Sequence, residues 1–329
     1  MSQYGCIRFP RQRAWIGLML ALLLLGTAFQ VALAVEPSVQ SAPPVTVRFP
    51  RLILTLNESG TVTDLGVVIS EGRQLGLAGP QLAFFRSVLG LNLSTQMFDT
   101  ATMAALSDAN IQHVEIQTGP EGIALYGNGR FMLGIQWGNQ AGLSEVARLG
   151  EAANVPFSAQ MAQIVPAIGA DVLVELPTPA GVERIAPRAV SAAAEFPKQA
   201  VPSSVAAIAL HASGEYAADG TARMFDRPLS EWGELFGADL RMLNLDPRAI
   251  SVFQEAGIQS IGVTVDNRGV SLLFDDDPVA TVVPGDEESL EIAMRLADRF
   301  QVPFANLIPV ASRMRKLDIQ VTVALPAAQ

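Results

Sequence analysis

The sequence predicts an α+β protein made of two tandem homologous domains, each an antiparallel sheet with helices packed mainly on one face. Three observations lead to this prediction: an internal repeat, two hairpin signals in each copy, and an amphipathic helix after each set of strands. Residues 98–157 reappear without a gap as residues 245–304. Identical pairs include Asp99/Asp246, Ala109/Ala256, Ile111/Ile258, Gln112/Gln259, Gly122/Gly269, Leu125/Leu272, Gly138/Gly285, Leu143/Leu290, Arg148/Arg295 and Leu149/Leu296.

The first helix of the repeat is capped in the same way in both copies. Asp99 and Asp246 stand where a helix N-cap is needed, because an aspartate side chain accepts a hydrogen bond from the first turn. The two copies end this helix with Asn110 and Gly257, the residue types that best tolerate a left-handed C-terminal cap. Different residues therefore meet one backbone requirement.

A three-stranded meander is predicted after each capped helix. Apolar and polar residues alternate on either side of a turn at residues 119–122, and again around residues 266–269. A second turn follows at Asn128-Gly129 in the first copy and at Asp275-Asp276 in the second. Asn-Gly between alternating runs is a strong signal for a two-residue hairpin.

An amphipathic helix follows each meander, with an apolar stripe at helical spacing that would pack on the sheet. A strand then closes each copy, at residues 171–176 and 318–325. Before the repeat, residues 52–56 and 206–210 read as matching strands that end at Ser-Gly, and residues 81–89 and 229–236 read as short helices. The stripe consists of Leu143, Val146, Ala147 and Gly150 in one copy and Leu290, Ala293, Met294 and Ala297 in the other.

These elements give a domain plan in which each repeat should fold alone. Residues 1–34 are a signal peptide or N-terminal membrane anchor, and residues 35–48 are a tether. The first α+β repeat domain spans residues 49–177 and the second spans residues 204–329. Residues 178–203, rich in Pro and Ala, are expected to link them.

The N-terminus predicts export from the cytoplasm. Basic residues Arg8, Arg11 and Arg13 precede an apolar run, and Ala-Leu-Ala at residues 32–34 offers a cleavage site. Residues 14–34 could instead span a membrane if they are not removed. The expected location is periplasmic or extracellular, and the single cysteine, Cys6, lies within the targeting segment.

Composition excludes two classes of protein. With 50% hydrophobic and 16% charged residues, the chain can bury a core and is not intrinsically disordered. A net charge of −10 argues against a nucleic-acid partner, which would need a basic surface to displace counterions from phosphates.

No catalytic motif is recognisable. His113 and His211, the two histidines, are expected to be surface or rim residues at a strand start and a strand end, since neither has a second ligand at metal spacing. The run Gly127-Asn128-Gly129 resembles a nucleotide-binding fingerprint only superficially, because it lies in a hairpin and no helix begins there. We therefore expect a protein that is not an enzyme.

An acidic cluster in the second copy is the one candidate metal site. Oxygen-rich clusters suit Ca²⁺, which takes about six to eight oxygen ligands. Turn formation and helix capping explain the same residues equally well. The matching residues of the first copy, Asn128, Gly129, Arg130, Asn139, Gln140 and Ala141, could not make such a site. The candidate ligands are Asp275, Asp276, Asp277, Asp286, Glu287 and Glu288.

Aromatic and methionine residues leave two interpretations open. Trp137 and Trp232 are placed as core residues rather than as ligand platforms. Four methionines could mark an adaptable apolar pocket or could fill gaps in the core. They are Met97, Met103, Met132 and Met161.

The hairpin with Asn-Gly, the strand ending in Trp137 and the capped helix after it resemble the uncharacterised tandem-repeat secreted or envelope proteins of filamentous green non-sulphur bacteria. The hairpin-then-helix portion is also similar to small stalk-like domains of bacterial surface enzymes, over about a third of each unit. Pro284 replaces the tryptophan in the second copy. Neither resemblance implies catalytic residues.

Two functions remain from the sequence. The first is a non-enzymatic, exported cell-envelope protein whose paired domains act as a binding or structural module for an envelope protein or surface polymer. The alternative is an extracytoplasmic carrier of an apolar small molecule or lipid, suggested by a mean hydropathy of +0.31. A hydrolase that uses Asp275 or Asp286 is a weaker third hypothesis.

Overall fold

The computed structural model describes ten stretches of the chain. They are residues 47–69, 73–77, 97–155, 165–178, 181–189, 208–236, 240–266, 268–286, 288–299 and 317–327, together with a few single residues between them. The predicted targeting segment, most of the tether and the helix expected at residues 81–89 lie outside these stretches. In the part that is described, no helix is both long and apolar enough to cross a membrane.

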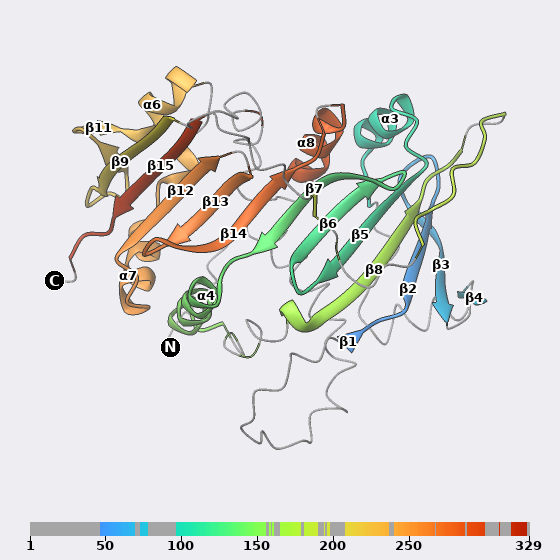
Figure 1. The fold of residues 1–329 in the computed structure, drawn as a ribbon, viewed down its shortest axis with the longest axis horizontal. Helices are drawn as coiled ribbons and strands as arrows, with labels where there is room; N and C mark the ends of the chain where they lie inside the picture. The colour runs from blue at the N-terminus through green and yellow to red at the C-terminus, as the bar shows by residue number, and fades with distance from the viewer. Residues whose placement is uncertain are drawn as a thin grey trace, which may run out of the picture.

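One continuous mixed sheet of 15 strands forms the centre of the molecule (Figure 1). The strand order is β11-β10-β9-β15-β12-β13-β14-β7-β6-β5-β8-β2-β3-β4, with β1 paired to β8. Most neighbours are antiparallel; the parallel pairs are β1 with β8, β2 with β8 and β9 with β15. The strands are β1 (Val47–Arg48), β2 (Arg51–Leu56), β3 (Val62–Ile69), β4 (Arg73–Leu77), β5 (His113–Gly119), β6 (Gly122–Gly127), β7 (Arg130–Trp137), β8 (Ile168–Glu175), β9 (Ile208–Tyr216), β10 (Ala222–Met224), β11 (Arg227–Pro228), β12 (Ser260–Asp266), β13 (Gly269–Phe274), β14 (Asp277–Pro284) and β15 (Leu317–Ala324).

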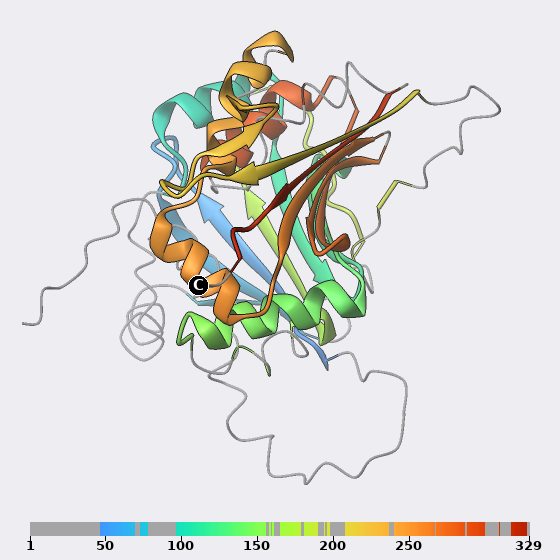
Figure 2. The same cartoon turned by 90° about the vertical axis from the view of Figure 1, so that its left-hand side faces the viewer.

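The helices gather on one side of this curved sheet (Figure 2). We call that side the helix face and the opposite side the outer face. The described helices are α3 (Thr100–Asp108), α4 (Gln140–Ala152), α6 (Leu229–Phe236), α7 (Pro247–Glu255) and α8 (Leu290–Arg299), with short 3₁₀ turns η2 (Val165–Ala167) and η3 (Leu240–Leu243). The fold is therefore α+β, as predicted.

The two repeats meet strand to strand, through β7 and β14. These strands pair antiparallel, with Ile135 opposite Val282 at the centre of the contact. Ile135 and Val282 are the same position of the repeat, so each copy contacts its own counterpart, as the subunits of a twofold-symmetric dimer do. The prediction of two separate domains is wrong: the repeats are halves of one sheet.

Each repeat also places its amphipathic helix on the other repeat. On α4, the apolar residues Val146, Leu149 and Ala152 pack against the core of the second repeat. On α8, Ile292, Leu296 and their neighbours are part of the core of the first repeat, beside α3 and β7. The stripe predicted on α8 is confirmed, whereas α4 packs through Val146, Leu149 and Ala152, so only Val146 of its predicted stripe is among these residues. Both helices cover the partner's strands rather than their own. Each repeat thus completes the other's core.

Two glycines permit the crossing from strand to swapped helix. The Gly138 N–H donates to the Val279 carbonyl at 2.8 Å, and the Gly285 N–H donates to the Met132 carbonyl at 2.8 Å. These two bonds are equivalent across the repeat. A Cβ on Gly138 would stand 1.8 Å from the Pro278 carbonyl oxygen, so the close approach of the backbones requires glycine.

The local predictions inside the repeat are confirmed. Asp99 caps α3 and Asp246 caps α7, each accepting a backbone N–H from the first turn. Asn110 and Gly257 adopt positive φ of 54° and 75°. The two-residue hairpins at 128–129 and 275–276 also have positive φ, as the type I′ turn demands.

The predicted correspondence between residues 52–56 of the first copy and residues 206–210 of the second is wrong. The structure extends β9 through Ser213-Gly214 to Tyr216 and turns at Gly220, whose N–H donates to Ala217 O as that of Gly60 donates to Asn57 O. The register confirms this, because Leu52 faces Val172 while Ala212 faces Val321. Arg51 on β2 therefore corresponds to His211 on β9.

Candidate binding site on the outer face of the sheet

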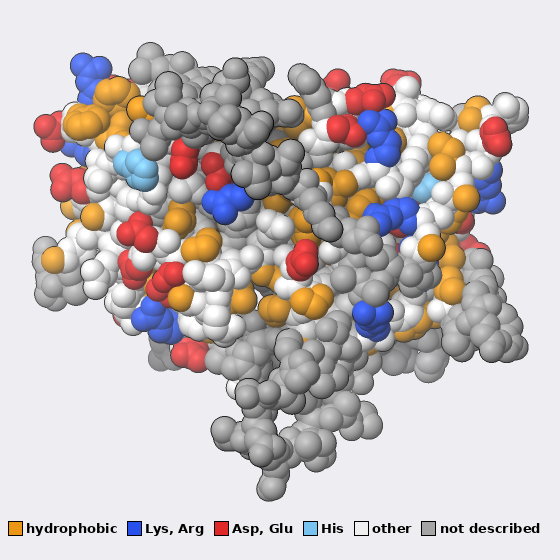
Figure 3. Space-filling model, in the orientation of Figure 1, with side chains coloured by type: hydrophobic (Ala, Val, Ile, Leu, Met, Phe, Trp, Pro, Cys, Tyr) orange, Lys and Arg blue, Asp and Glu red, His pale blue; other side chains and the backbone are white. Residues whose placement is uncertain are grey.

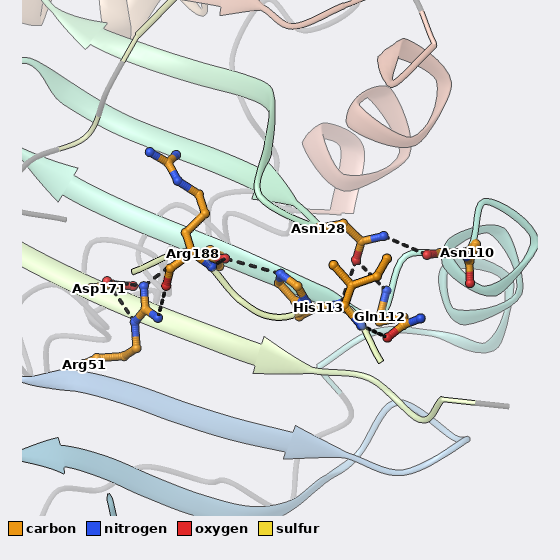
Figure 4. A network of polar contacts seen from close by, with 9 residues as sticks. Arg51, Asn110, Gln112, His113, Asn128, Asp171 and Arg188 are labelled. Carbon is orange, nitrogen blue, oxygen red and sulfur yellow. Dashed lines mark hydrogen bonds and ion pairs between the residues drawn. The ribbon is translucent and has the colours of Figure 1, made fainter. Parts of the chain in front are cut away.

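Residues 181–189, predicted to be part of a linker, lie along the outer face of the first repeat. We call this segment the strap. Three side chains of the sheet hold its backbone, namely Gln112, Glu115 and Arg51 (Figure 4). The linker prediction is wrong for these described residues, because they bind the sheet instead of spacing two domains.

Gln112 binds the strap with both ends of its amide. Its Nε2 donates to the Glu183 carbonyl at 2.8 Å, and its Oε1 accepts from the Ile185 N–H at 2.9 Å. A backbone donor and a backbone acceptor are thereby satisfied by one side chain, as a neighbouring strand would satisfy them. The contact depends on the peptide backbone and not on the strap's side chains.

An ion cluster holds the next part of the strap. Arg51 donates to Oδ2 of Asp171 at 2.7 and 2.9 Å, and its Nη1 donates to the Arg188 carbonyl at 2.7 Å. Glu115 accepts the Arg188 N–H at 3.0 Å. Arg51, Glu115 and Asp171 are 5%, 0% and 5% exposed, so the cluster is buried.

The two carboxylates of the cluster respond to burial in opposite ways. Burial disfavours the charged form of Glu115, but the close contact with His113, the hydrogen bond from the Arg188 N–H and the charge of Arg51 together outweigh it, so the pKa of Glu115 is lowered. For Asp171 burial dominates over the contact with Arg51, and its pKa is raised. The strap is therefore held by an ionised Glu115.

Aromatic contacts extend the site beyond the ion cluster. The Arg188 guanidinium carbon lies 4.1 Å from the centre of the Tyr126 ring, a cation–π contact. Phe131 contacts both Tyr126 and Phe196, with ring centroids 5.7 and 5.8 Å apart. Phe196 thus adds apolar contact with the same face, 8 residues after Arg188 in the chain.

Three side chains in this region have buried polar atoms without a hydrogen-bond partner among the described residues: Gln117 at its amide, Asp171 at Oδ1 and His113 at Nε2. Gln117 and Asp171 are directly opposite each other on β5 and β8. An ordered water between them would satisfy both, because buried water typically bridges such groups. The site as a whole binds an extended chain through its backbone, by way of Gln112, Arg51 and Glu115, and orients that chain through the charges of the buried cluster.

The structure places the predicted calcium ligands at opposite ends of β14. Asp277 begins this strand and accepts from Asn139 Nδ2 at 2.8 Å. Asp286 follows its end and, with Glu288, accepts from Arg130 at 2.7 and 2.9 Å. Glu287 lies outside the described residues. Within those that are described, no three His, Cys, Asp or Glu side chains are arranged to hold a metal ion.

Two of these acids, Asp275 and Asp286, have hydrogen-bonded roles that their counterparts in the first repeat share. Asp275 Oδ1 accepts the N–H groups of Gln259 and Ser260, as Asn128 Oδ1 accepts those of Gln112 and His113. Asp286 caps α8 through the Ser289 N–H, as Asn139 caps α4 through the Gly142 N–H. Asp276 Oδ1 accepts from Gln320 Nε2 at 3.3 Å. Calcium binding stays a prediction.

The histidine predictions need correction. His113 begins β5 as expected, but it is 3% exposed, with Nε2 3.3 Å from Glu115 Oε1. It is buried because the strap covers this face. His211 is exposed as expected, but lies within β9 rather than at its end.

Trp137 and Trp232 are half-buried, and their indole N–H groups donate to the carbonyls of Gly119 and Met224. Met103 and Met132 are buried in the core of the first repeat, and Met97 packs against it. Met161 lies outside the described residues. All three methionines therefore pack in or against the core, and Met103 also lines a cavity beside α3, so both interpretations hold for Met103.

Sequence reasoning missed the strap site. Its residues come from β2, β5, β8, the residue before β5 and the supposed linker. Glu115 and Gln117 alternate with apolar residues, a pattern typical of a strand with one solvent-facing side. One signal was available: Gln112 is identical in the two copies although it belongs to neither a cap nor an apolar stripe.

The comparisons with known proteins come to a single outcome. No family model, no curated protein and no solved structure matches this chain. The site is therefore interpreted from its own geometry.

Proposed function

We propose that this chain is a non-enzymatic, exported cell-envelope protein that acts as a binding and structural module. One observation supports it above the others: the outer face of the sheet holds an extended polypeptide segment by bonding its backbone through Gln112, Arg51 and Glu115. A face built to hold a chain in this way suits recognition of a polypeptide. Export, a periplasmic or extracellular location and the resemblance to secreted tandem-repeat proteins belong to the same proposal.

The swapped helices support the structural part of the proposal. Because α4 and α8 each complete the other repeat's core, the two outer faces are held in one rigid sheet. Such a scaffold fixes the separation of two binding surfaces, as duplicated modules in an envelope would require. Separate domains on a flexible linker would not do so.

The carrier function is the second candidate, and one observation favours it. A cavity of about 240 Å³ lies beside α3, lined by Met103, Ala104, Ile111 and Leu176 with Glu58 at its edge. Ligand pockets are commonly about 300–1,000 Å³, so the cavity would take only a small apolar molecule. The binding module is the better account.

Native mass spectrometry of residues 35–329, purified without detergent from the native host, separates the two functions. The binding module predicts a bare polypeptide mass, and chemical cross-linking in the host before purification should join partner peptides to the outer face. A discrete small-molecule mass lost on denaturation would instead favour the carrier. An excess mass equal to calcium would support the acidic site. Cross-links confined to the helix face would contradict the proposal.

A further inference from the structure

The second repeat carries a counterpart of the strap-binding residues that no described residue occupies. Gln259 corresponds to Gln112, and its backbone is held by the same bonds. The Gln259 N–H donates to Asp275 Oδ1 at 2.8 Å, and its carbonyl accepts from the Leu325 N–H at 2.7 Å. For Gln112 the same bonds, to Asn128 and Leu176, both measure 2.8 Å. The two side chains therefore start from equivalent positions.

The surroundings of the two glutamines differ in one respect. The Gln112 side chain is buried under the strap at 5% exposure, whereas Gln259 is exposed. No described residue bonds the Gln259 amide. A side chain that binds a peptide backbone in one repeat is thus presented to solvent in the other.

A second strap-binding position is also retained in altered form. His211 corresponds to Arg51, the residue that donates to the Arg188 carbonyl. His211 is exposed and its imidazole can donate a hydrogen bond. Gly262 stands where Glu115 stands in the first repeat. The second repeat therefore keeps a glutamine that can bind a backbone N–H and a carbonyl, and a donor in His211, but it lacks the carboxylate acceptor.

The charge on this part of the outer face indicates what would bind. Asp318 and Gln320 share the outer face of β15, because Ile319 and Val321 pack toward the core. Asp276 bonds Gln320 and so reaches over the same face. No described Lys or Arg pairs with Asp276 or Asp318. Figure 3, which views the outer face, shows acidic side chains gathered over the strands of the second repeat.

We propose that the outer face of β9, β15 and the start of β12 binds an extended polypeptide segment of a partner protein, one that carries basic side chains. Gln259 binds its backbone as Gln112 binds the strap, His211 donates to a carbonyl further along, and Asp276 and Asp318 attract its cations. The inference rests on the proposed function and names the partner class for the second repeat.

The test uses the strap's own sequence as the probe. A fluorescein-labelled peptide of residues 181–189, which contains Arg184 and Arg188, is titrated with the full exported chain and followed by fluorescence anisotropy. We expect binding with a Kd below about 1 mM that weakens as salt is raised, because exposed charges are screened. Gln259→Ala should weaken it roughly tenfold, since it removes two hydrogen bonds. His211→Ala should weaken it about threefold.

Gln140→Ala is the matched control, because Gln140 is an exposed glutamine at the start of α4 on the other side of the sheet. It should leave the affinity unchanged, and circular dichroism checks that each variant is folded. Binding that is unchanged by Gln259→Ala would overturn the site while leaving the proposed function standing. No binding up to about 1 mM would overturn the inference. The cross-linking experiment then decides the proposed function separately.

Discussion

Arg51 and His211 occupy the same position in the two repeats, yet one is buried in an ion cluster and the other is exposed. The residues around them differ in the same sense: Glu115 and Asp171 beside Arg51 correspond to Gly262 and Gln320 beside His211. The first repeat thus holds its own strap with a buried ion cluster, whereas the second has neutral residues at the positions of Glu115 and Asp171 and carries its acidic charge nearby, on Asp276 and Asp318. A common scaffold has kept its backbone bonds while its two outer faces diverged.

The shared sheet with its swapped helices is tested most directly by separating the two repeats, and this is the largest expected effect. Residues 204–329 alone would expose the β14 edge and leave the apolar side of α8, including Ile292 and Leu296, without a core. We expect this fragment not to be a monomer. It should form a twofold dimer, with Val282 pairing its own counterpart, or aggregate. Size-exclusion chromatography with light scattering measures this, and a folded monomer would contradict the swapped arrangement.

The charged half of the comparison is tested at Arg51. Arg51→Met would leave Glu115 and Asp171 buried without their cation, and breaking a buried pair in this way costs about 3–5 kcal/mol. The matched variant in the second repeat is His211→Met, which should change the free energy of unfolding by no more than about 0.5 kcal/mol because the site is exposed. Urea unfolding of both variants gives the comparison. Equal losses of unfolding free energy in the two variants would show that Arg51 and His211 contribute equally to stability, and would contradict this comparison.

Local sequence signals predicted the elements of this fold well, because caps and turns depend on residues near one another in the chain. Asp99, Asn110 and Asn128 each meet a requirement set within a few residues, and the structure confirms them. The swap could not be predicted in this way. The stripe on α4 states that one side of the helix is apolar, but it does not state which sheet will cover that side.

The candidate site was beyond local reasoning for a related reason. Glu115 alternates with apolar neighbours on β5, which usually indicates a solvent-facing residue. The strap that buries it returns from more than 70 residues away, and it belongs to residues 178–203, whose Pro and Ala content resembles a linker. The acidic residues were conspicuous, yet Asp275 and Asp286 occupy the positions of Asn128 and Asn139 and share their hydrogen bonds.

A smaller difference is expected at the paired glutamines. Gln112→Ala would leave the Glu183 carbonyl and the Ile185 N–H without their partner under a partly buried strap, at a cost of about 1–3 kcal/mol. Gln259→Ala should cost close to nothing, since no described residue bonds that side chain. Urea unfolding is again the measurement. A similar loss for both variants would mean that Gln259 is already occupied within the chain.

The smallest expected effect appears only in acid and comes from Glu115. Its pKa is lower in the folded protein than in the unfolded chain, so it stabilises the fold above the unfolded value of 4.5. That contribution is lost as the pH falls from 4.5 through the folded pKa. Glu115→Gln should remove this part of the acid dependence, so its unfolding free energy should fall less steeply than that of the wild type below pH 4.5.

Asp171 acts in the opposite direction, which allows the two carboxylates to be separated. Its pKa is raised in the folded protein, so the unfolding free energy of the wild type falls as the pH rises through this titration. Asp171→Asn has no such titration and should lack this fall. The difference in unfolding free energy, wild type minus Asp171→Asn, should therefore be largest at low pH and should shrink as the pH rises through the titration. Urea unfolding at a series of pH values measures this difference. A difference that instead grows as the pH rises would show that the fold stabilises the ionised carboxylate, which contradicts a raised pKa.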